Sequence, residues 1–295
     1  MPGSFSPPRT TMTARFALFL SRIPTPRRYG RIMALLLASL GGAVDVFSHI
    51  HYKALVATQT GNFILLIADM SHSSQHAIHL RWLSVIFFSL GYLGGHLLHD
   101  LLGQRAHLKH WRIFTLVPFL LVCFVTPLIH RVSEHGVQVG ALAFTIGLLI
   151  HALADTRIGE NPFSLFMTSG NWRKMLSAWY TAGALYTRAI ANACSTRRER
   201  VVRRRVEARH PSADTSPARP EDEERRTRRR ALMTALDYSL VVGGFVAGVI
   251  AMALLDHLVG SISLWFVGCL AAGAFWVGFR AEKNEDADNE AEAQS

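Results

Sequence analysis

Apolar residues run through the chain in long blocks, and most charged residues lie between or beyond the blocks. Each block covers about 18 to 22 residues, the length that a helix needs to cross about 30 Å of hydrocarbon. Six blocks are clear on a sliding hydropathy window, and they cover residues 31–50, 81–102, 111–129, 137–154, 236–255 and 261–277. The pattern predicts an all-α integral membrane protein with about six transmembrane helices.

Two further segments, 54–70 and 162–194, are ambiguous, because the first is barely long enough to cross and the second carries three basic residues. If both cross, the chain has eight spans, and the basic loop 105–112 lies outside, against the positive-inside tendency. If both dip in and return, or lie at the interface, the chain has six spans. This loop, the Arg-rich insert at 195–233 and both termini are then cytoplasmic. We favour six helices plus two shorter broken or re-entrant segments.

The two ambiguous segments contain similar motifs. Residues 57–62 (Ala-Thr-Gln-Thr-Gly-Asn) match residues 166–171 (Phe-Met-Thr-Ser-Gly-Asn), and each motif follows a block that ends near an acid, Asp45 or Asp155. Such matches at a fixed offset predict two internal repeats, residues 31–130 and 137–279. An odd number of crossings per half would invert the second repeat relative to the first, as in many transporters. An eight-span chain would have parallel halves.

Paired glycines recur downstream of both motifs. Gly91 and Gly95 in the first half match Gly244 and Gly248 in the second, and Gly-x-x-x-Gly pairs let helices approach closely in lipid. These four residues are therefore predicted to lie at helix-packing contacts.

The two motifs supply the candidate residues of a solute or ion pathway: Thr60, Gly61, Asn62, Ser169, Gly170 and Asn171. Thr, Ser and Asn can cap unpaired backbone amides, and a helix that starts within the membrane points N–H groups at its neighbours, which suits a polar solute. A kink or packing contact is the alternative. If the halves are inverted repeats, Asn62 and Asn171 approach each other and serve one site.

Two ionisable residues within the predicted spans join this candidate pathway. Asp45 lies about two thirds along its span, where a charge costs about 2.5–3.5 kcal/mol on insertion scales, so it must face a cavity or a partner. It is either a proton or cation site or a structural acid bonded to backbone amides. His151 is either a packing histidine or one that faces solute.

Three landmarks resemble a known family: Gly42-Ala-Val-Asp45, Thr60-Gly61-Asn62 and the segment from Gly91 to Gly95. They resemble the YoaK-like family of bacterial membrane proteins, a domain of unknown function, over about residues 33–279. The chain departs from that pattern at Ser169 and in its long Arg-rich insert. The resemblance implies a bacterial inner-membrane protein with a transport role.

Charge is concentrated in a basic leader (1–30), an Arg-rich insert (195–233) and an acidic tail (280–295). Their composition predicts disordered cytoplasmic segments, with the insert binding anionic headgroups of the bilayer. The net charge of +10 does not predict nucleic-acid binding, because no nucleic-acid-binding module is present.

The three cysteines are widely separated, so no metal site, cofactor or disulfide framework is expected. Whether the chain forms a homo-oligomer is left open.

Two functions remain. The leading hypothesis is a transporter or channel for a small polar solute or ion. The alternative is a non-transporting assembly, scaffold or lipid-binding protein whose polar motifs only build the fold. We do not expect an enzyme with catalytic residues, because the sequence shows no G-x-S-x-G, no H-E-x-x-H and no paired intramembrane carboxylates.

Overall fold

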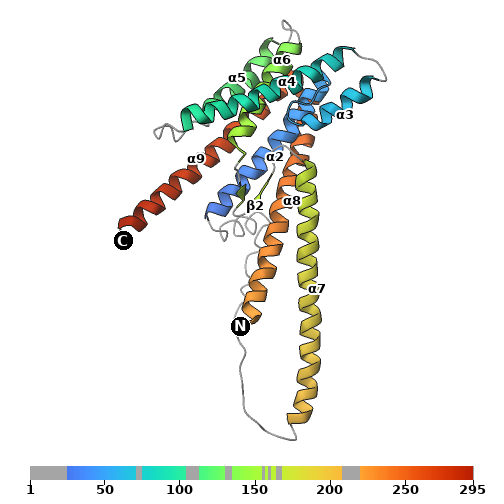
Figure 1. Cartoon of the computed structure of the whole chain (residues 1–295), viewed down its shortest axis with the longest axis vertical. Helices are drawn as coiled ribbons and strands as arrows, with labels where there is room; N and C mark the ends of the chain where they lie inside the picture. The colour runs from blue at the N-terminus through green and yellow to red at the C-terminus, as the bar shows by residue number, and fades with distance from the viewer. Residues whose placement is uncertain are drawn as a thin grey trace, which may run out of the picture.

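The computed structural model describes residues 25–70, 75–103, 113–129, 135–154, 157–158, 161–163, 168–207 and 220–294. Within them the helices are α2 (Thr25–Tyr52), α3 (Gln59–Met70), α4 (Gln75–Leu98), α5 (Ile113–Ile129), α6 (His135–Ala152), α7 (Thr168–Glu207), α8 (Pro220–Val259) and α9 (Leu264–Gln294). A π-helical turn, η1 (His99–Gly103), extends α4, and a 3-10 turn, η2 (Gly260–Ser263), joins α8 to α9. Two-residue strands β1 (Arg157–Ile158) and β2 (Asn161–Pro162) form a small antiparallel hairpin after α6 (Figure 1).

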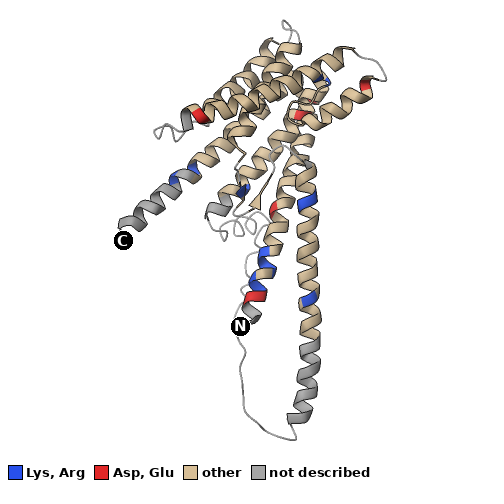
Figure 2. Ribbon diagram, viewed as in Figure 1, with Lys and Arg blue, Asp and Glu red and all other residues tan. Residues whose placement is uncertain are grey.

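The helices of the described residues are those of an all-α membrane protein. Four helical stretches are long and apolar enough to cross a bilayer: Tyr29–Tyr52, Gln75–Leu101, His135–Ala152 and Glu223–Ala281. The last contains most of α8 and the first part of α9, which meet at Gly260, a glycine with φ of +58°. A shorter apolar helix covers Phe114–Ile129. Charged residues are sparse among these helices: they gather in the first turns of α8, and isolated ones lie on α7 and α9 (Figure 2).

Helices from different halves of the sequence pack in pairs. α2 lies along α8, and α4 lies along α6. A Cβ added at Gly248 would lie 2.0 Å from the carbonyl oxygen of Ser39, so α8 meets the α2 backbone directly. Because Arg31 contacts Asp237 and Ser39 contacts Gly248, positions along the two helices advance together, and the helices run in the same direction.

The α4–α6 pair has the same geometry. A Cβ at Gly91 would lie 2.0 Å from the carbonyl oxygen of Phe144, and one at Gly95 would lie 2.8 Å from the His151 side chain. These helices are again parallel, since both positions advance along the chain. Gly244 likewise faces Leu35 of α2, with a Cβ-to-side-chain distance of 2.9 Å. All four glycines of the predicted packing pairs therefore lie at helix contacts.

Helix replaces the disorder that we expected in the charged segments. α7 continues to Glu207, α8 begins at Pro220, and α9 runs to Gln294, so 195–207, 220–233 and 280–294 are helical. The leader's residues 25–30 also belong to α2, while residues 1–24 and 208–219 lie outside the described part. Ala, Arg, Glu and Lys have high helix propensity, and Pro suits the first helical position. Our composition argument gave these local preferences too little weight.

Candidate functional site

An irregular turn joins α2 to α3, and we call it the 53–58 turn. Its first residue, Lys53, has a φ of +56°, which L-residues other than glycine seldom adopt. Backbone N–H and C=O groups that leave a helix need other partners, above all where lipid offers none. In the structure, buried side chains from three helices supply those partners.

Asp45 is the partner that α2 contributes. Its side chain is 6% exposed, and Oδ1 accepts hydrogen bonds from the backbone N–H of Ala57 at 2.8 Å and of Thr58 at 3.3 Å. Its other oxygen accepts the hydroxyl of Thr58. Of the two interpretations that the sequence left open, this geometry is the one expected of a structural acid bonded to backbone amides.

Asn62 is the partner from α3, and its side chain is fully buried. Its Oδ1 accepts the N–H of Leu55 at 2.8 Å, and its Nδ2 donates to the carbonyl oxygen of Leu55 at 2.5 Å. Nδ2 also lies 3.0 Å from Oε1 of Gln59 and 3.2 Å from Oγ of Ser84. The asparagine therefore satisfies both backbone groups of one turn residue.

The other two residues of this motif, Thr60 and Gly61, differ from Asn62 in their contacts. Thr60 is exposed, so its hydroxyl does not take part in this network. Gly61 donates its N–H to the carbonyl oxygen of Thr58 at 3.2 Å, and a Cβ there would lie 2.5 Å from the side chain of Leu55. Glycine thus lets the turn approach the first turn of α3 closely.

α4 completes the network with residues that sequence reasoning missed. Arg81 is 4% exposed, donates to the carbonyl oxygens of Lys53 and Leu65 at 2.8 Å each, and pairs with Asp69. Ser84 donates to the carbonyl oxygen of Leu55 at 2.6 Å. A signal was available, because Arg81 is a lone cation at the start of an apolar block with an acid shortly before it.

The second motif lies at the corresponding place in its own helix. Asn62 is the fourth residue of α3 and Asn171 the fourth of α7, and Asn171 is 2% exposed. Ser169 is exposed and Gly170 is half-buried. Asp155 lies outside the described residues. The hydrogen bonds described for Asn62 all stay within residues 55–84, and its approach to Asn171 stays a prediction.

His151 belongs to an aromatic cluster at the C-terminal ends of α4 and α6. Its ring centroid lies 3.9 Å from that of His96, 5.4 Å from Tyr92 and 5.9 Å from His99. We did not predict from the sequence that histidines at the end of α4 would meet His151. Within the described residues, no group of His, Cys, Asp or Glu side chains has the geometry of a metal site.

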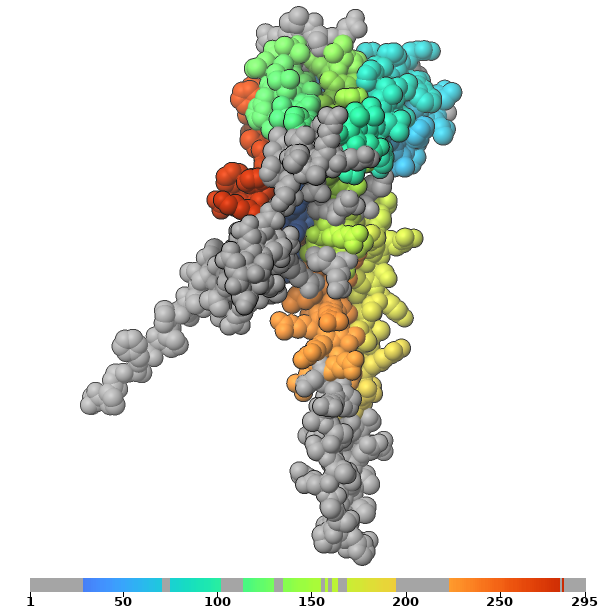
Figure 3. Space-filling view, turned by 60° about the vertical axis from the view of Figure 1, so that its left-hand side comes forward, coloured from blue at the N-terminus to red at the C-terminus, as the bar shows by residue number. Residues whose placement is uncertain are grey.

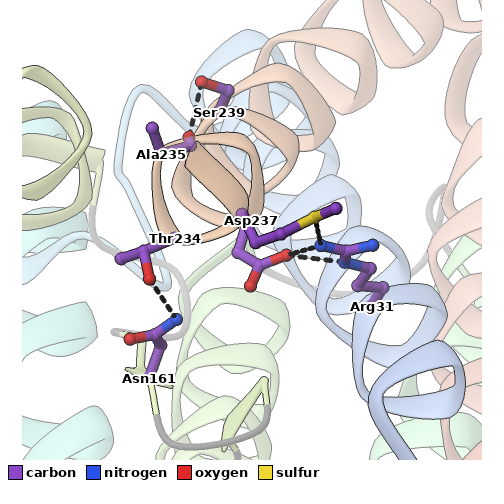
Figure 4. Close-up of polar contacts among 7 residues, drawn as sticks. Arg31, Asn161, Thr234, Ala235, Asp237 and Ser239 are labelled. Atoms are coloured by element: carbon purple, nitrogen blue, oxygen red, sulfur yellow. Dashed lines mark hydrogen bonds and ion pairs between the residues drawn. The ribbon is translucent and has the colours of Figure 1, made fainter. Parts of the chain in front are cut away.

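Two ion pairs join α2 to α8, one toward each end of their contact. Toward the N-terminal end, Arg31 donates Nε–H to Oδ1 of Asp237 at 2.6 Å, and both side chains are buried (Figure 4). Toward the C-terminal end, Nε2 of His51 lies 2.7 Å from Oδ1 of Asp256, which also accepts the hydroxyl of Ser263 at 3.2 Å. Neither pair was predicted, although an acid inside the block 236–255 was a visible signal.

A family model described as a protein of unknown function (DUF1275) matches residues 33–277. The chain belongs to the DUF1275 family. The DUF1275 match includes the 53–58 turn, all its side-chain partners and both Gly-Asn motifs, whereas Arg31 and the charged end of α9 lie outside it. No curated protein and no solved structure matches the chain.

Proposed function

We propose that this DUF1275 protein is a multi-pass protein of a bacterial inner membrane that carries a small polar solute or ion across it. In this proposal the two halves are inverted repeats that move against each other, and no chemical reaction is catalysed. The alternating exposure of a central site between inverted repeats is a mechanism shared by many secondary transporters.

The observation that carries the proposal is the pattern of helix contacts. Exchanging the halves pairs α2 with α6, α3 with α7, α4 with α8 and α5 with α9. Under this exchange the contact of α2 with α8 becomes that of α6 with α4, and the contact of α3 with α4 becomes that of α7 with α8. The contact of α2 with α9 likewise becomes that of α6 with α5, and all of these contacts occur.

Contacts between helix ends support six crossings with inverted halves. Arg81, near the start of α4, bonds the carbonyl oxygen of Lys53, just after the end of α2. The ring of Tyr52 lies 5.7 Å from that of His135, the first residue of α6. The end of α2 and the starts of α4 and α6 therefore share one side. α3, at 12 residues, spans only about 18 Å, too little to cross.

The opposite side of the helices carries the hairpin and the basic segments. A Cβ at Gly30, near the start of α2, would lie 3.0 Å from the carbonyl oxygen of Arg157 in β1. We assign this side to the cytoplasm, because the basic leader and the Arg-rich insert adjoin it and cytoplasmic loops are enriched in Lys and Arg. Both termini are then cytoplasmic, and the insert can contact anionic headgroups.

Flux measurement is the test of the proposal. The full chain would be reconstituted into proteoliposomes and screened with radiolabelled or fluorescently reported ions, amino acids, sugars and organic anions, beside protein-free vesicles. Saturable flux of any of them supports the proposal, and its absence across the screen with correctly inserted, folded protein refutes it. Single cysteines placed outside the family match report the side on which each terminus lies.

One observation favours the alternative, a scaffold or assembly protein. The oxygens of Asp45 and the amide of Asn62 are already bonded to the backbone of the 53–58 turn, as residues that only build a fold would be. Under this alternative, Asp45→Asn changes stability alone. Under the transport proposal, the same change also alters the pH dependence of flux in folded protein, so paired flux and unfolding measurements separate the two.

A further inference from the structure

A cleft of about 620 Å³ lies between α7 and α8. Its polar lining consists of Arg173, Lys174, Ser177, Thr181, Thr234 and Tyr238, with two alanines at its sides. Among the residues that the structure describes, the lining contains two cations, four hydroxyl groups and no carboxylate. In the space-filling view, the side chains of α7, in yellow, lie against those of α8, in orange (Figure 3).

Neighbouring contacts hold one cation of the cleft in place. Nζ of Lys174 donates to the carbonyl oxygen of Pro162 in β2 at 3.1 Å and lies 5.7 Å from the ring centre of Tyr238. The hydroxyl of Tyr238 donates to the same oxygen, also at 3.1 Å. Asn161 bonds the hydroxyl of Thr234 at 3.3 Å, so the hairpin supports the α8 side of the cleft (Figure 4).

The other cation is available to a ligand. Arg173 is exposed and has no hydrogen bond or ion pair in the part of the chain that the structure describes. A guanidinium group presents N–H donors in a fork that matches two oxygens of a phosphate. Beside it, Ser177 and Thr181 follow at helical spacing along α7, so their hydroxyls share its face of the helix.

The cleft lies where the apolar parts of two helices begin. Thr234 and Tyr238 flank Asp237, the partner of Arg31 at the start of the apolar part of α2. Trp179 of α7 donates its indole N–H to Ser239 at 2.8 Å and remains 43% exposed. Tryptophan is enriched at the level of lipid headgroups. The cleft is therefore at the membrane surface rather than in its centre.

We propose that this cleft binds the phosphate of an acidic phospholipid headgroup, with Arg173 and Lys174 as the charged contacts. Basic clefts between helices on the cytoplasmic side of a membrane are suited to such headgroups. Exposed Leu176 and Tyr180 on the same helix give an acyl chain an apolar surface, which a free phosphate would not use. The proposal does not depend on transport, because it concerns a surface site outside the 53–58 turn.

The test uses the full chain in neutral detergent, titrated with phosphatidylglycerol or phosphatidylcholine and followed by native mass spectrometry. Arg173→Gln should weaken phosphatidylglycerol binding about fivefold, the effect of one basic residue near an anionic surface, and leave phosphatidylcholine binding unchanged. The matched control is Arg188→Gln, an exposed cation of the same helix that does not line the cleft. It should leave both affinities unchanged.

Three outcomes would overturn the proposal. Equal weakening by Arg173→Gln and Arg188→Gln would show general electrostatic attraction. Equal binding of both lipids would show that the net negative charge of the phosphatidylglycerol headgroup is not recognised. If inorganic phosphate raised the unfolding midpoint of the lipid-free protein, and Arg173→Gln abolished that increase, the cleft would be assigned to a soluble anion. Lys174→Gln provides a second variant, and its unfolding midpoint without lipid shows whether the hairpin remains in place.

Discussion

Replacing Asn62 tests whether the 53–58 turn depends on one amide. In Asn62→Ala, the N–H of Leu55 loses its described acceptor, whereas the carbonyl oxygen of Leu55 keeps the hydroxyl of Ser84. This part-buried donor is then unsatisfied, at a cost of up to about 1–3 kcal/mol. A small cavity adds to this cost, since the side chain is fully buried.

Asn62→Asp is the sharper variant, because the carboxylate has nearly the same shape as the amide. It can still accept the N–H of Leu55, but its second oxygen would replace the donor that lies 2.5 Å from the carbonyl oxygen of Leu55. Two acceptors would face each other, and a charge would be buried. We expect Asn62→Asp to destabilise the protein at least as much as Asn62→Ala, in spite of its closer shape.

The assay is reversible unfolding in mixed detergent micelles, with Thr60→Ala as the control in the same motif. Thr60 is exposed, so its replacement should change the unfolding free energy by less than about 0.5 kcal/mol. A neutral Asn62→Asp, or equal losses at positions 60 and 62, would refute the reasoning. In that case the turn would be stabilised by its other partners alone.

Three further outcomes are expected. Gly248→Leu should separate α8 from α2 and strongly lower stability in thermal unfolding, since even an added Cβ would lie 2.0 Å from the carbonyl oxygen of Ser39. Its control is Gly243→Ala, where an added Cβ meets nothing within 4 Å, and this change should be neutral or stabilising. Asp237→Asn should cost about 3–5 kcal/mol, measured by the same assay, by leaving Arg31 buried without its counter-charge. Asp45→Asn should leave the protein folded but remove pH dependence from any flux measured in proteoliposomes.

The apolar blocks were predictable because crossing length and hydropathy are local properties of the sequence. The same holds for the Gly-Asn motifs, since each lies at the start of a helix: α3 begins at Gln59 and α7 at Thr168. The partners of the first motif were harder to find. Arg81 and Ser84 bond the 53–58 turn only because α3 folds back along α4, which hydropathy does not encode.

The contacts between the two halves could not be predicted, because predicting them needs information that a single sequence lacks. The histidine cluster forms because α4 and α6 are parallel neighbours, and their ends coincide only after the whole chain has packed. The expectation of disorder in the charged segments differed from the structure for another reason. Their composition indicated solvent exposure, which is compatible with helix as well as with disorder, and we inferred disorder from exposure alone.

The distribution of polar contacts indicates which parts could move. The 53–58 turn is bonded by α2, α3 and α4, all of the first half, so it should remain rigid within that half. The contact between α2 and α8 is built differently, from glycine backbone approaches with the Arg31–Asp237 pair toward one end and the His51–Asp256 pair toward the other. These two ion pairs lie toward opposite ends of parallel helices. A rocking of one half against the other could therefore break one ion pair while the other stays intact. The transport proposal therefore locates its moving surface between the halves and its fixed polar groups inside them, and the scaffold alternative requires no movement at either place.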